Sequence, residues 1–501
     1  MVAAAGTFWA LRTTGSPEQV ADKYLRAWEA QDYVAMRELV ADPPADFERL
    51  HRRFRTDLKL DQASFTRHVP NGVFASDAAS TGVVSFKAVL TGPQDWTYSG
   101  KLDFVERDRT WKIDWTAAAI HPRLAKGRSV RLVEGKVPVT QVLAADGSRI
   151  DTPEAPGSMA QLVEGLKQTY PDRFAEYAGA RIDLVEGGKV VETLVKAPEK
   201  EPLRTTIDLK VHQAGADALR DVRKPASLVA TRPSTGEILA VVNKPGGFNR
   251  ALLGKYPPGS TFKVVTASAL VADGMKPAER VACPAEQNIG GFPFHNAGFK
   301  DYGTLAFRDA FAHSCNTTFG AMGVADLGKE RLAKVAESFG FGAEIAPGVP
   351  AVRADFPTPK DDTDLASAAI GQGRVLASPL NMASVAAAIA YGAWQPPRLV
   401  PEEVVPDNTL RPRRLEDAVV KALRELMPAV VTDGTAHGVS FPAGTAGKTG
   451  TAEYGSGKEP PAHSWFIGYR GDLAFAVIVE GGGAGSAVAA PVAARFLAEL
   501  A

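Results

Sequence analysis

The sequence predicts a multidomain α+β protein made of three consecutive regions, residues 16–121, 122–202 and 203–501. The chain of 501 residues is too long for one ordinary domain of roughly 100–200 residues. The first region has helical spacing followed by alternating strand patterns, which is typical of an α+β domain. The third region has strand patterns near both ends and Ala-rich helical stretches between them. That order predicts a single sheet built from both ends of the region and flanked by helices.

The elements of the first region follow from capping and alternation. Ser16 and Pro17 begin a helix as N-cap and first helical residue, with Gln19 completing a capping box. Asp32 starts a short second helix that runs to Val40, and residues 47–58 form a third. Strands with alternating apolar residues are expected at residues 83–90, 96–104 and 111–115. We interpret the aromatic residues here as core.

The second region is a spacer or small module to which we assign no function. Its expected elements are strands at residues 131–133, 138–143 and 189–195, a helix at 158–169 and a polar linker at 196–202. The third region has a clearer pattern. Its expected elements are a helix at residues 209–221, a hairpin of strands 226–231 and 237–242, strands at 446–453, 464–469 and 474–479, and a final helix at 491–500.

Composition excludes several classes of protein. Lys+Arg and Asp+Glu are both 57, and a formal net charge of zero argues against a general nucleic-acid binder. The two cysteines, Cys283 and Cys315, are too few for a multi-disulfide framework or a multi-cysteine zinc site. Nothing marks Cys315 as a nucleophile, and we interpret it as a buried small side chain. A bond between the two cysteines is compatible with an oxidising compartment but cannot be inferred from the sequence. The eight histidines include no His-Glu-x-x-His, so we expect no metal and no cofactor.

The first chemical motif is Ser260 with Lys263, which lies one helical turn further on and on the same face. Gly and Pro precede Ser260 and an apolar helical run follows it, so the serine is expected at a helix N-terminus. A serine hydroxyl needs a base within hydrogen-bond reach to act as a nucleophile. A lysine can be that base when burial, a nearby positive charge and the helix N-terminus lower its pKa.

Two further motifs carry the remaining polar groups. Ser314 can relay a proton to a leaving amine, and the amide of Asn316 can bond both a substrate amide and the lysine. In the later strand, Lys448 and Thr449 can hold a substrate carboxylate through charge-assisted hydrogen bonds. Gly450 would let a substrate backbone come close to that strand, and the backbone N–H groups of Thr451 and Ser260 would form an oxyanion hole. Lys448 also supplies a like charge that keeps Lys263 neutral.

In the order Ser-x-x-Lys, Ser-x-Asn and Lys-Thr-Gly, the motifs resemble the signature of penicillin-binding proteins and serine β-lactamases. The third region is similar, over nearly its whole length, to the transpeptidase domain of class B penicillin-binding proteins. Besides the motifs, the segments that carry this similarity are residues 205–210, 234–240, 371–373, 378–380 and 463–468. The first region resembles, in pattern and position, the nuclear-transport-factor-2-like N-terminal domain of the methicillin-resistance type.

This resemblance implies a D,D-transpeptidase that cross-links peptidoglycan stem peptides. Ser260 would attack the D-Ala-D-Ala carbonyl, Lys263 would take its proton, and an amine of a neighbouring stem would resolve the acyl-enzyme. The resemblance also implies β-lactams as covalent inhibitors and cell-wall synthesis or division proteins as partners, while the net charge of zero predicts no nucleic-acid partner. The family is extracytoplasmic, and we expect an N-terminal membrane anchor that is absent or trimmed in this chain. The apolar residues 1–11 are either the end of such a segment or a frayed terminus.

Three alternatives stay open at this point. A class D-like β-lactamase shares Ser-x-x-Lys and Lys-Thr-Gly, although Ser-x-Asn and the long N-terminal portion argue against it. A non-catalytic β-lactam-binding scaffold or sensor would not need every motif residue, and all of them are present. A D,D-carboxypeptidase, in which water replaces the acceptor amine, cannot be separated from a transpeptidase by sequence.

Overall fold

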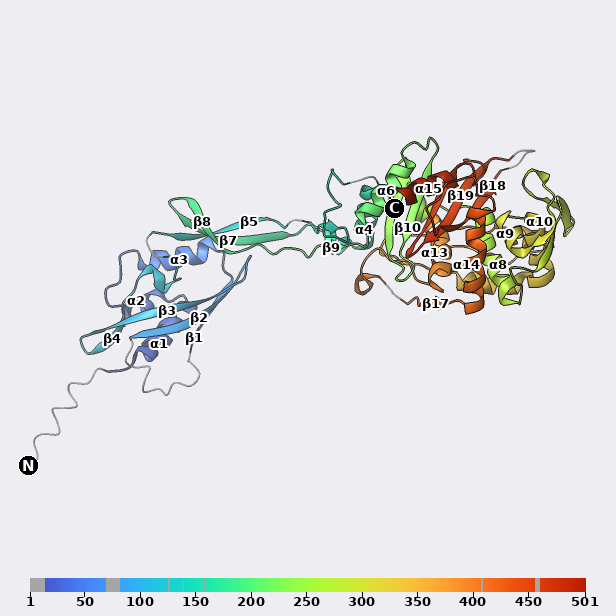
Figure 1. Ribbon diagram of the computed structural model, residues 1–501. Coiled ribbons are helices and arrows are strands. Elements are labelled where there is room, and N and C mark those ends of the chain that lie inside the picture. Colours follow the sequence, from blue (N-terminus) through green and yellow to red (C-terminus); the bar gives the residue numbers. More distant parts are fainter. Residues whose placement is uncertain are drawn as a thin grey trace, which may run out of the picture. The chain divides into compact units, whose positions relative to one another are not determined.

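The computed structural model describes residues 14–68, 82–124, 127–137, 139–155, 158–406, 409–455 and 460–501. The apolar residues 1–11 and Pro138, the first residue of one expected strand, lie outside the described ranges. The chain divides into two compact units (Figure 1). The first unit comprises residues 1–139 and 175–200, and the second comprises 140–174 and 201–501. Residues of the expected spacer therefore contribute to both units.

The first unit begins with the three expected helices. They are α1 (Pro17–Glu29), α2 (Tyr33–Glu38) and α3 (Phe47–Asp57). Ser16 caps α1 by accepting a hydrogen bond from the backbone N–H of Gln19, and Asp32 caps α2 in the same way. An antiparallel sheet follows, in the order β1-β2-β3-β4, with strands at Gln62–Arg67, Val83–Thr91, Trp96–Arg107 and Thr110–Ile113. A second sheet, in the order β5-β7-β8, has strands at Ser129–Lys136, Ala178–Glu186 and Lys189–Val195.

Aromatic side chains and buried histidines fill the core of the first unit. The rings of Trp28 and Phe65 stack with centroids 4.0 Å apart. His51 is 1% exposed, and its Nε2 lies 3.0 Å from the hydroxyl of Tyr24. That hydroxyl also accepts a hydrogen bond from Nε1 of Trp115. The aromatic residues of this region are therefore core, as the sequence indicates, and the polar atoms of Tyr24 and Trp115 are paired within it.

One antiparallel sheet organises the second unit. Its strand order is β11-β10-β20-β19-β18, with strands at Ile238–Lys244, Ala226–Thr231, Leu473–Val479, Ala462–Arg470 and Ala446–Glu453. β10, from the start of the third region, pairs with β20 from its end, which confirms the expected sheet built from both ends. All residues of β10 are buried, so helices cover both of its faces. α6 (Leu209–Leu219) and α15 (Ala489–Ala498) form one layer, and α13 (Pro379–Tyr391) with α14 (Asp417–Thr432) forms the other (Figure 1).

The remaining elements of the second unit surround this sheet. The helices are α4 (Met159–Thr169), α5 (Pro171–Phe174), α7 (Arg250–Leu253), α8 (Lys263–Ala272), α9 (Phe307–Ala312), α10 (Asn316–Met322), α11 (Gly328–Ser338) and α12 (Asp362–Ala369). The short strand pairs are β6–β9 (Val142–Leu143 and Leu203–Arg204), β12–β15 (Arg280–Cys283 and Gly303–Ala306), β13–β14 (Glu286–Ile289 and Phe292–His295) and β16–β17 (Ala393–Trp394 and Arg413–Arg414).

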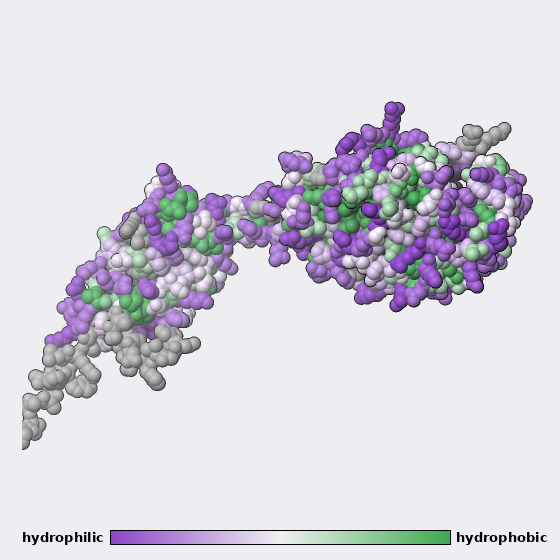
Figure 2. Space-filling view, viewed as in Figure 1, coloured by the Kyte–Doolittle hydropathy of each residue, from purple (hydrophilic) through white to green (hydrophobic). Residues whose placement is uncertain are grey.

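Figure 2 shows one face of the molecule. In the face shown in Figure 2, hydrophilic residues predominate and hydrophobic ones are scattered among them. Within the described ranges, no helix combines the length and the apolar character that a membrane span requires.

Candidate active site

The site is built where the start of α8 meets the edge strand β18. Ser260 lies in a short 3-10 turn, Gly259–Phe262, which leads directly into α8 at Lys263. Lys263 is fully buried and its Nζ lies 3.0 Å from Oγ of Ser260. This places the amine within hydrogen-bond reach of the hydroxyl that it would have to deprotonate.

The Ser-x-Asn motif meets the same amine. Nζ of Lys263 donates to the carbonyl oxygen of Ser314 at 2.7 Å and lies 3.2 Å from the Ser314 hydroxyl. It also donates to Oδ1 of Asn316 at 2.6 Å. Ser314 has a positive φ of 62°, which turns the chain between α9 and α10 and brings both polar side chains to Lys263. The structure thus brings Ser260, Lys263, Ser314 and Asn316 together around one nitrogen.

Two buried lysines determine the electrostatics of the site. Burial, and secondly the positive charge of Lys448, hold the pKa of Lys263 well below its ordinary value. Burial lowers the pKa of Lys448 to about 7. Burial and the like charge, both expected from the sequence, therefore lower the pKa of Lys263, and burial is the larger cause.

The Lys-Thr-Gly motif lies on β18, which is the edge strand of the sheet. Lys448 and Thr449 are buried, and Nζ of Lys448 donates to the carbonyl oxygen of Thr449. A Cβ added to Gly450 would lie 2.8 Å from Cγ2 of Thr261 and 3.1 Å from the carbonyl oxygen of Pro258. In the structure, the absent side chain of Gly450 therefore lets the Ser260 turn pack on the strand, a packing role that the Lys-Thr-Gly spacing does not indicate.

The turn that carries Ser260 is held close to Thr451 by two glycines. A Cβ added to Gly259, whose φ is +54°, would lie 2.7 Å from the carbonyl oxygen of Thr451. The N–H of Gly259 donates to the carbonyl oxygen of Gly371 at 2.8 Å, and Gly371 has a φ of +71°. Both positions combine left-handed backbone with close approach, which only glycine accommodates readily. The result is that the Ser260 turn and the Thr451 peptide lie side by side.

Sequence reasoning missed one polar neighbour of this strand. The hydroxyls of Thr435 and Thr449 form a hydrogen bond of 2.6 Å. Thr435 follows α14, and its N–H donates to the carbonyl oxygen of Ala312 at 3.0 Å. No motif spacing indicates this residue, because its partner lies on a different element. Among the residues that the structure describes, no group of three or more His, Cys, Asp or Glu side chains is arranged to hold a metal ion.

Comparison with known proteins agrees with this geometry. Residues 226–498 match the penicillin-binding protein transpeptidase domain, and residues 16–128 match the NTF2-like N-terminal transpeptidase domain. The chain therefore belongs to the penicillin-binding protein transpeptidase family. The family and the multidomain fold predicted from the sequence are confirmed.

Two similar proteins and one solved structure illustrate the relationship. Peptidoglycan D,D-transpeptidase PbpA of Mycolicibacterium smegmatis is 33% identical over 356 residues, covering 59% of this chain and 71% of that protein. The PbpA of Mycobacterium tuberculosis is 32% identical over 347 residues, covering 58% and 70%. The ceftriaxone acyl-enzyme complex of penicillin-binding protein A from M. tuberculosis matches with a TM-score of 0.55 and 30% identity, covering 61% of this chain and 81% of that one.

Proposed function

We propose that this protein is a peptidoglycan D,D-transpeptidase that acts through an acyl-enzyme on Ser260. The observation that carries the proposal is the 3.0 Å contact between Ser260 Oγ and a buried Lys263 amine whose pKa is strongly lowered. A neutral amine accepts the hydroxyl proton as the oxygen attacks the carbonyl of the D-Ala-D-Ala bond. The carbonyl carbon gains the bond to Oγ, the C–N bond breaks, and D-alanine leaves with a proton. An amine of a neighbouring stem then attacks the ester carbonyl, the bond between that carbon and Oγ breaks, and a proton lost by the amine returns to Ser260.

The surrounding groups take complementary roles in this proposal. Ser314, which bonds the same amine, relays the proton to the leaving nitrogen. One N–H of the Asn316 amide donates to the carbonyl oxygen of His295, and the other is directed to an amide carbonyl of the substrate. The backbone N–H groups of Ser260 and Thr451, on segments that touch through Gly259, stabilise the oxyanion.

Strand β18 supplies the carboxylate site. Lys448, Thr449 and Thr451 hold the terminal carboxylate of the stem peptide, and Gly450 lets the Ser260 turn pack against this strand. β-Lactams present a comparable carboxylate and a reactive amide, so we propose them as covalent inhibitors of Ser260. Because Lys448 also lowers the pKa of Lys263, it links carboxylate binding to activation of the nucleophile.

We propose further that residues 203–501 form the transpeptidase domain, residues 16–121 the nuclear-transport-factor-2-like domain and residues 122–202 a spacer. An extracytoplasmic location at the cell membrane is supported by the disulfide between Cys283 and Cys315, since such bonds persist in oxidising compartments. Proteins that polymerise glycan strands are proposed as partners, because cross-linking needs their product as substrate.

Intact-protein mass after addition of a penicillin tests the proposal. Wild type should gain a lasting single adduct and Ser260→Ala should gain none. Ser268→Ala is a matched control, because Ser268 lies on α8, which follows the Ser260 turn, and its hydroxyl bonds the carbonyl oxygen of Val264. A transient adduct with consumption of penicillin would instead indicate a β-lactamase, and no adduct would indicate a scaffold. A product assay with an acceptor amine separates transpeptidation from carboxypeptidation.

A further inference from the structure

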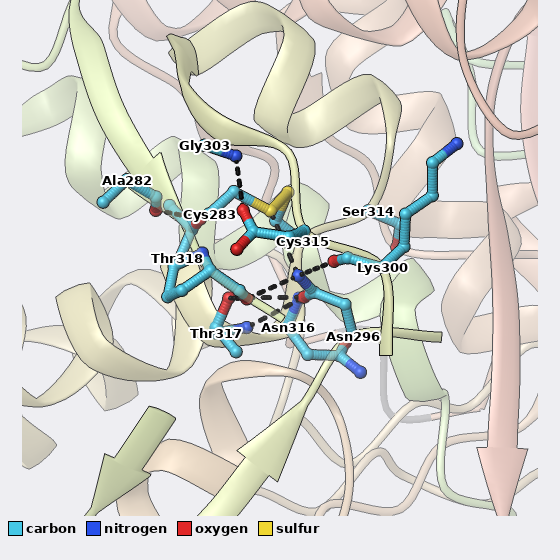
Figure 3. The surroundings of a disulfide bond; sticks show 12 residues. Ala282, Cys283, Asn296, Lys300, Gly303, Ser314, Cys315, Asn316, Thr317 and Thr318 are labelled. Atoms are coloured by element: carbon cyan, nitrogen blue, oxygen red, sulfur yellow. Dashed lines mark hydrogen bonds between the residues drawn. A yellow bond between two sulfur atoms is a disulfide. The ribbon is translucent and has the colours of Figure 1, made fainter. Parts of the chain in front are cut away.

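A buried asparagine outside the three motifs joins the Ser-x-Asn motif to residues 284–302, which lie between strands β12 and β15. Asn296 is 2% exposed. Its Nδ2 contacts Sγ of Cys283 and donates to the carbonyl oxygens of Pro284 and Lys300, at 2.8 and 3.0 Å (Figure 3). Buried polar groups are nearly always hydrogen-bonded, and the side-chain amide of Asn296 divides its hydrogen bonds between this segment and another part of the chain.

The other half of the side chain bonds the start of α10. Oδ1 of Asn296 accepts from the backbone N–H of Asn316 at 2.8 Å and from that of Thr317 at 3.3 Å (Figure 3). The first N–H groups of a helix have no partner within the helix. Cys315, at the N-cap position, makes no side-chain capping bond. Asn296 therefore caps α10 from 20 residues away in the sequence.

The residue before Asn296 completes the arrangement. The carbonyl oxygen of His295 accepts from Nδ2 of Asn316 at 3.0 Å, while Oδ1 of Asn316 accepts from Lys263. The backbone and the side-chain amide of Asn316 are thus both fixed by adjacent residues of one segment. The rotation of that amide decides whether its oxygen faces the lysine and its remaining N–H faces the substrate.

We infer that Asn296 is a positioning residue for acylation, acting through Asn316. The inference rests on the proposed function, in which the Asn316 amide holds an amide carbonyl of the substrate. Loss of Asn296 should release the start of α10 and the His295 carbonyl together, and Asn316 should then lose its fixed orientation. A misplacement of about 1 Å in such a group costs about 100-fold in rate.

The test compares two β-lactams that differ in the group Asn316 is proposed to hold. Benzylpenicillin carries a side-chain amide, and 6-aminopenicillanic acid lacks it. We expect Asn296→Ala to lower the second-order acylation rate constant for benzylpenicillin by about 10- to 100-fold, and to lower the preference for benzylpenicillin over 6-aminopenicillanic acid by at least about tenfold. Asn316→Ala should lower the same preference, and adding Asn296→Ala to it should have little further effect.

Two additional variants distinguish positioning from loss of folding. Asn296→Asp has the same shape and keeps an acceptor for α10, but it places a second oxygen against the carbonyls of Pro284 and Lys300. It should reduce the preference in the same direction. Asn288→Ala is the matched control, since Asn288 lies in the same segment and bonds only the N–H of Gly291. Melting temperatures are measured for every variant.

Different outcomes would refute the role of Asn296 and the proposed function of Ser260. An unchanged substrate preference in both Asn296 variants would overturn the inference, and so would an equal loss for both β-lactams that follows the melting temperature. A wild-type protein that is not acylated, or a Ser260→Ala variant that still is, would instead overturn the proposed function.

Discussion

Removing the disulfide should weaken the fold more than the site. Cys283 and Cys315 are 32 residues apart, and both are fully buried. Closing a loop of this length removes about 12 cal/mol/K of entropy from the unfolded chain, which corresponds to about 3.7 kcal/mol at 25 °C. For a unit of about 340 residues, the unfolding entropy of about 2.1 cal/mol/K per residue converts this loss into about 5 °C of melting temperature.

The assay is a thermal melt of the Cys283→Ala/Cys315→Ala double variant beside wild type, with acylation by penicillin measured at 25 °C. Acylation should stay within about threefold of wild type, because hydrogen bonds still tie the two segments together, each contributing about 0.5–1.5 kcal/mol. Besides those of Asn296, Thr317 Oγ1 donates to the carbonyl oxygen of Pro284 and Thr318 Oγ1 to that of Ala282.

A reducing agent provides the control for the disulfide. A dithiol should lower the melting temperature of wild type by the same amount and leave the double variant unchanged. An unaltered melting temperature in the double variant would refute the loop-entropy argument. A loss of acylation as complete as that of Ser260→Ala would refute the view that the hydrogen bonds suffice to hold Asn316.

Three other predictions concern protonation and one side-chain contact. Acylation should decline as the pH falls, because Lys263 must be neutral to accept the proton of Ser260. Lys448→Met removes a like charge and should raise the pKa of Lys263, so the acid limb of the pH–rate profile should move to higher pH. A shift of that limb to lower pH would contradict this. Burial lowers the pKa of His51 from 6.5 to about 4. As the pH falls from about 6.5 to about 4, His51 therefore takes up a proton in the unfolded chain but not in the folded one, and the first unit should lose stability across this range. His51→Gln should flatten this dependence in melts followed by tryptophan fluorescence, and an unchanged slope would exclude His51 as its source. Thr435→Val should reduce the acylation rate about two- to tenfold, because it removes the hydrogen bond to Thr449. Thr435→Ser keeps the hydroxyl and should retain the wild-type rate. Equal rates for both variants would show that this hydrogen bond does not contribute to acylation.

The sequence predicted those features that depend on local spacing. Strands 226–231 and 446–453 appear at their expected bounds, because each is a short run bounded by turn residues. Strand β1 was missed because only Phe65 of its six residues is buried, so alternation is hardly visible. Ser260 and Lys263 were found because one helical turn brings them together. Asn296 was not found, because it meets its partners only through the folded chain.

The disulfide is a second feature that could not be predicted from the sequence. A separation of 32 residues does not determine whether the Cα atoms of two cysteines come close enough for a disulfide. In the fold, these atoms lie 6.0 Å apart. The pairing depends on β12 and the start of α10 meeting, which is decided by packing of the whole helical part. The sequence could therefore leave the bond open but not predict it.

The division of the chain between its two units has a consequence for biosynthesis. The chain passes from one unit to the other three times, after residues 139, 174 and 200. Helix α4 buries Leu162 and Leu166, and Gly165 packs against Val349 and Pro350. A ribosome adding about 5–20 residues per second makes those partners about 10–40 s after the helix. The sheet β5-β7-β8 also cannot close until Val195 has emerged. During synthesis, the apolar side of α4 therefore stays exposed until residues near 350 have been made. In a chain cut after residue 200, this side of α4 would remain exposed.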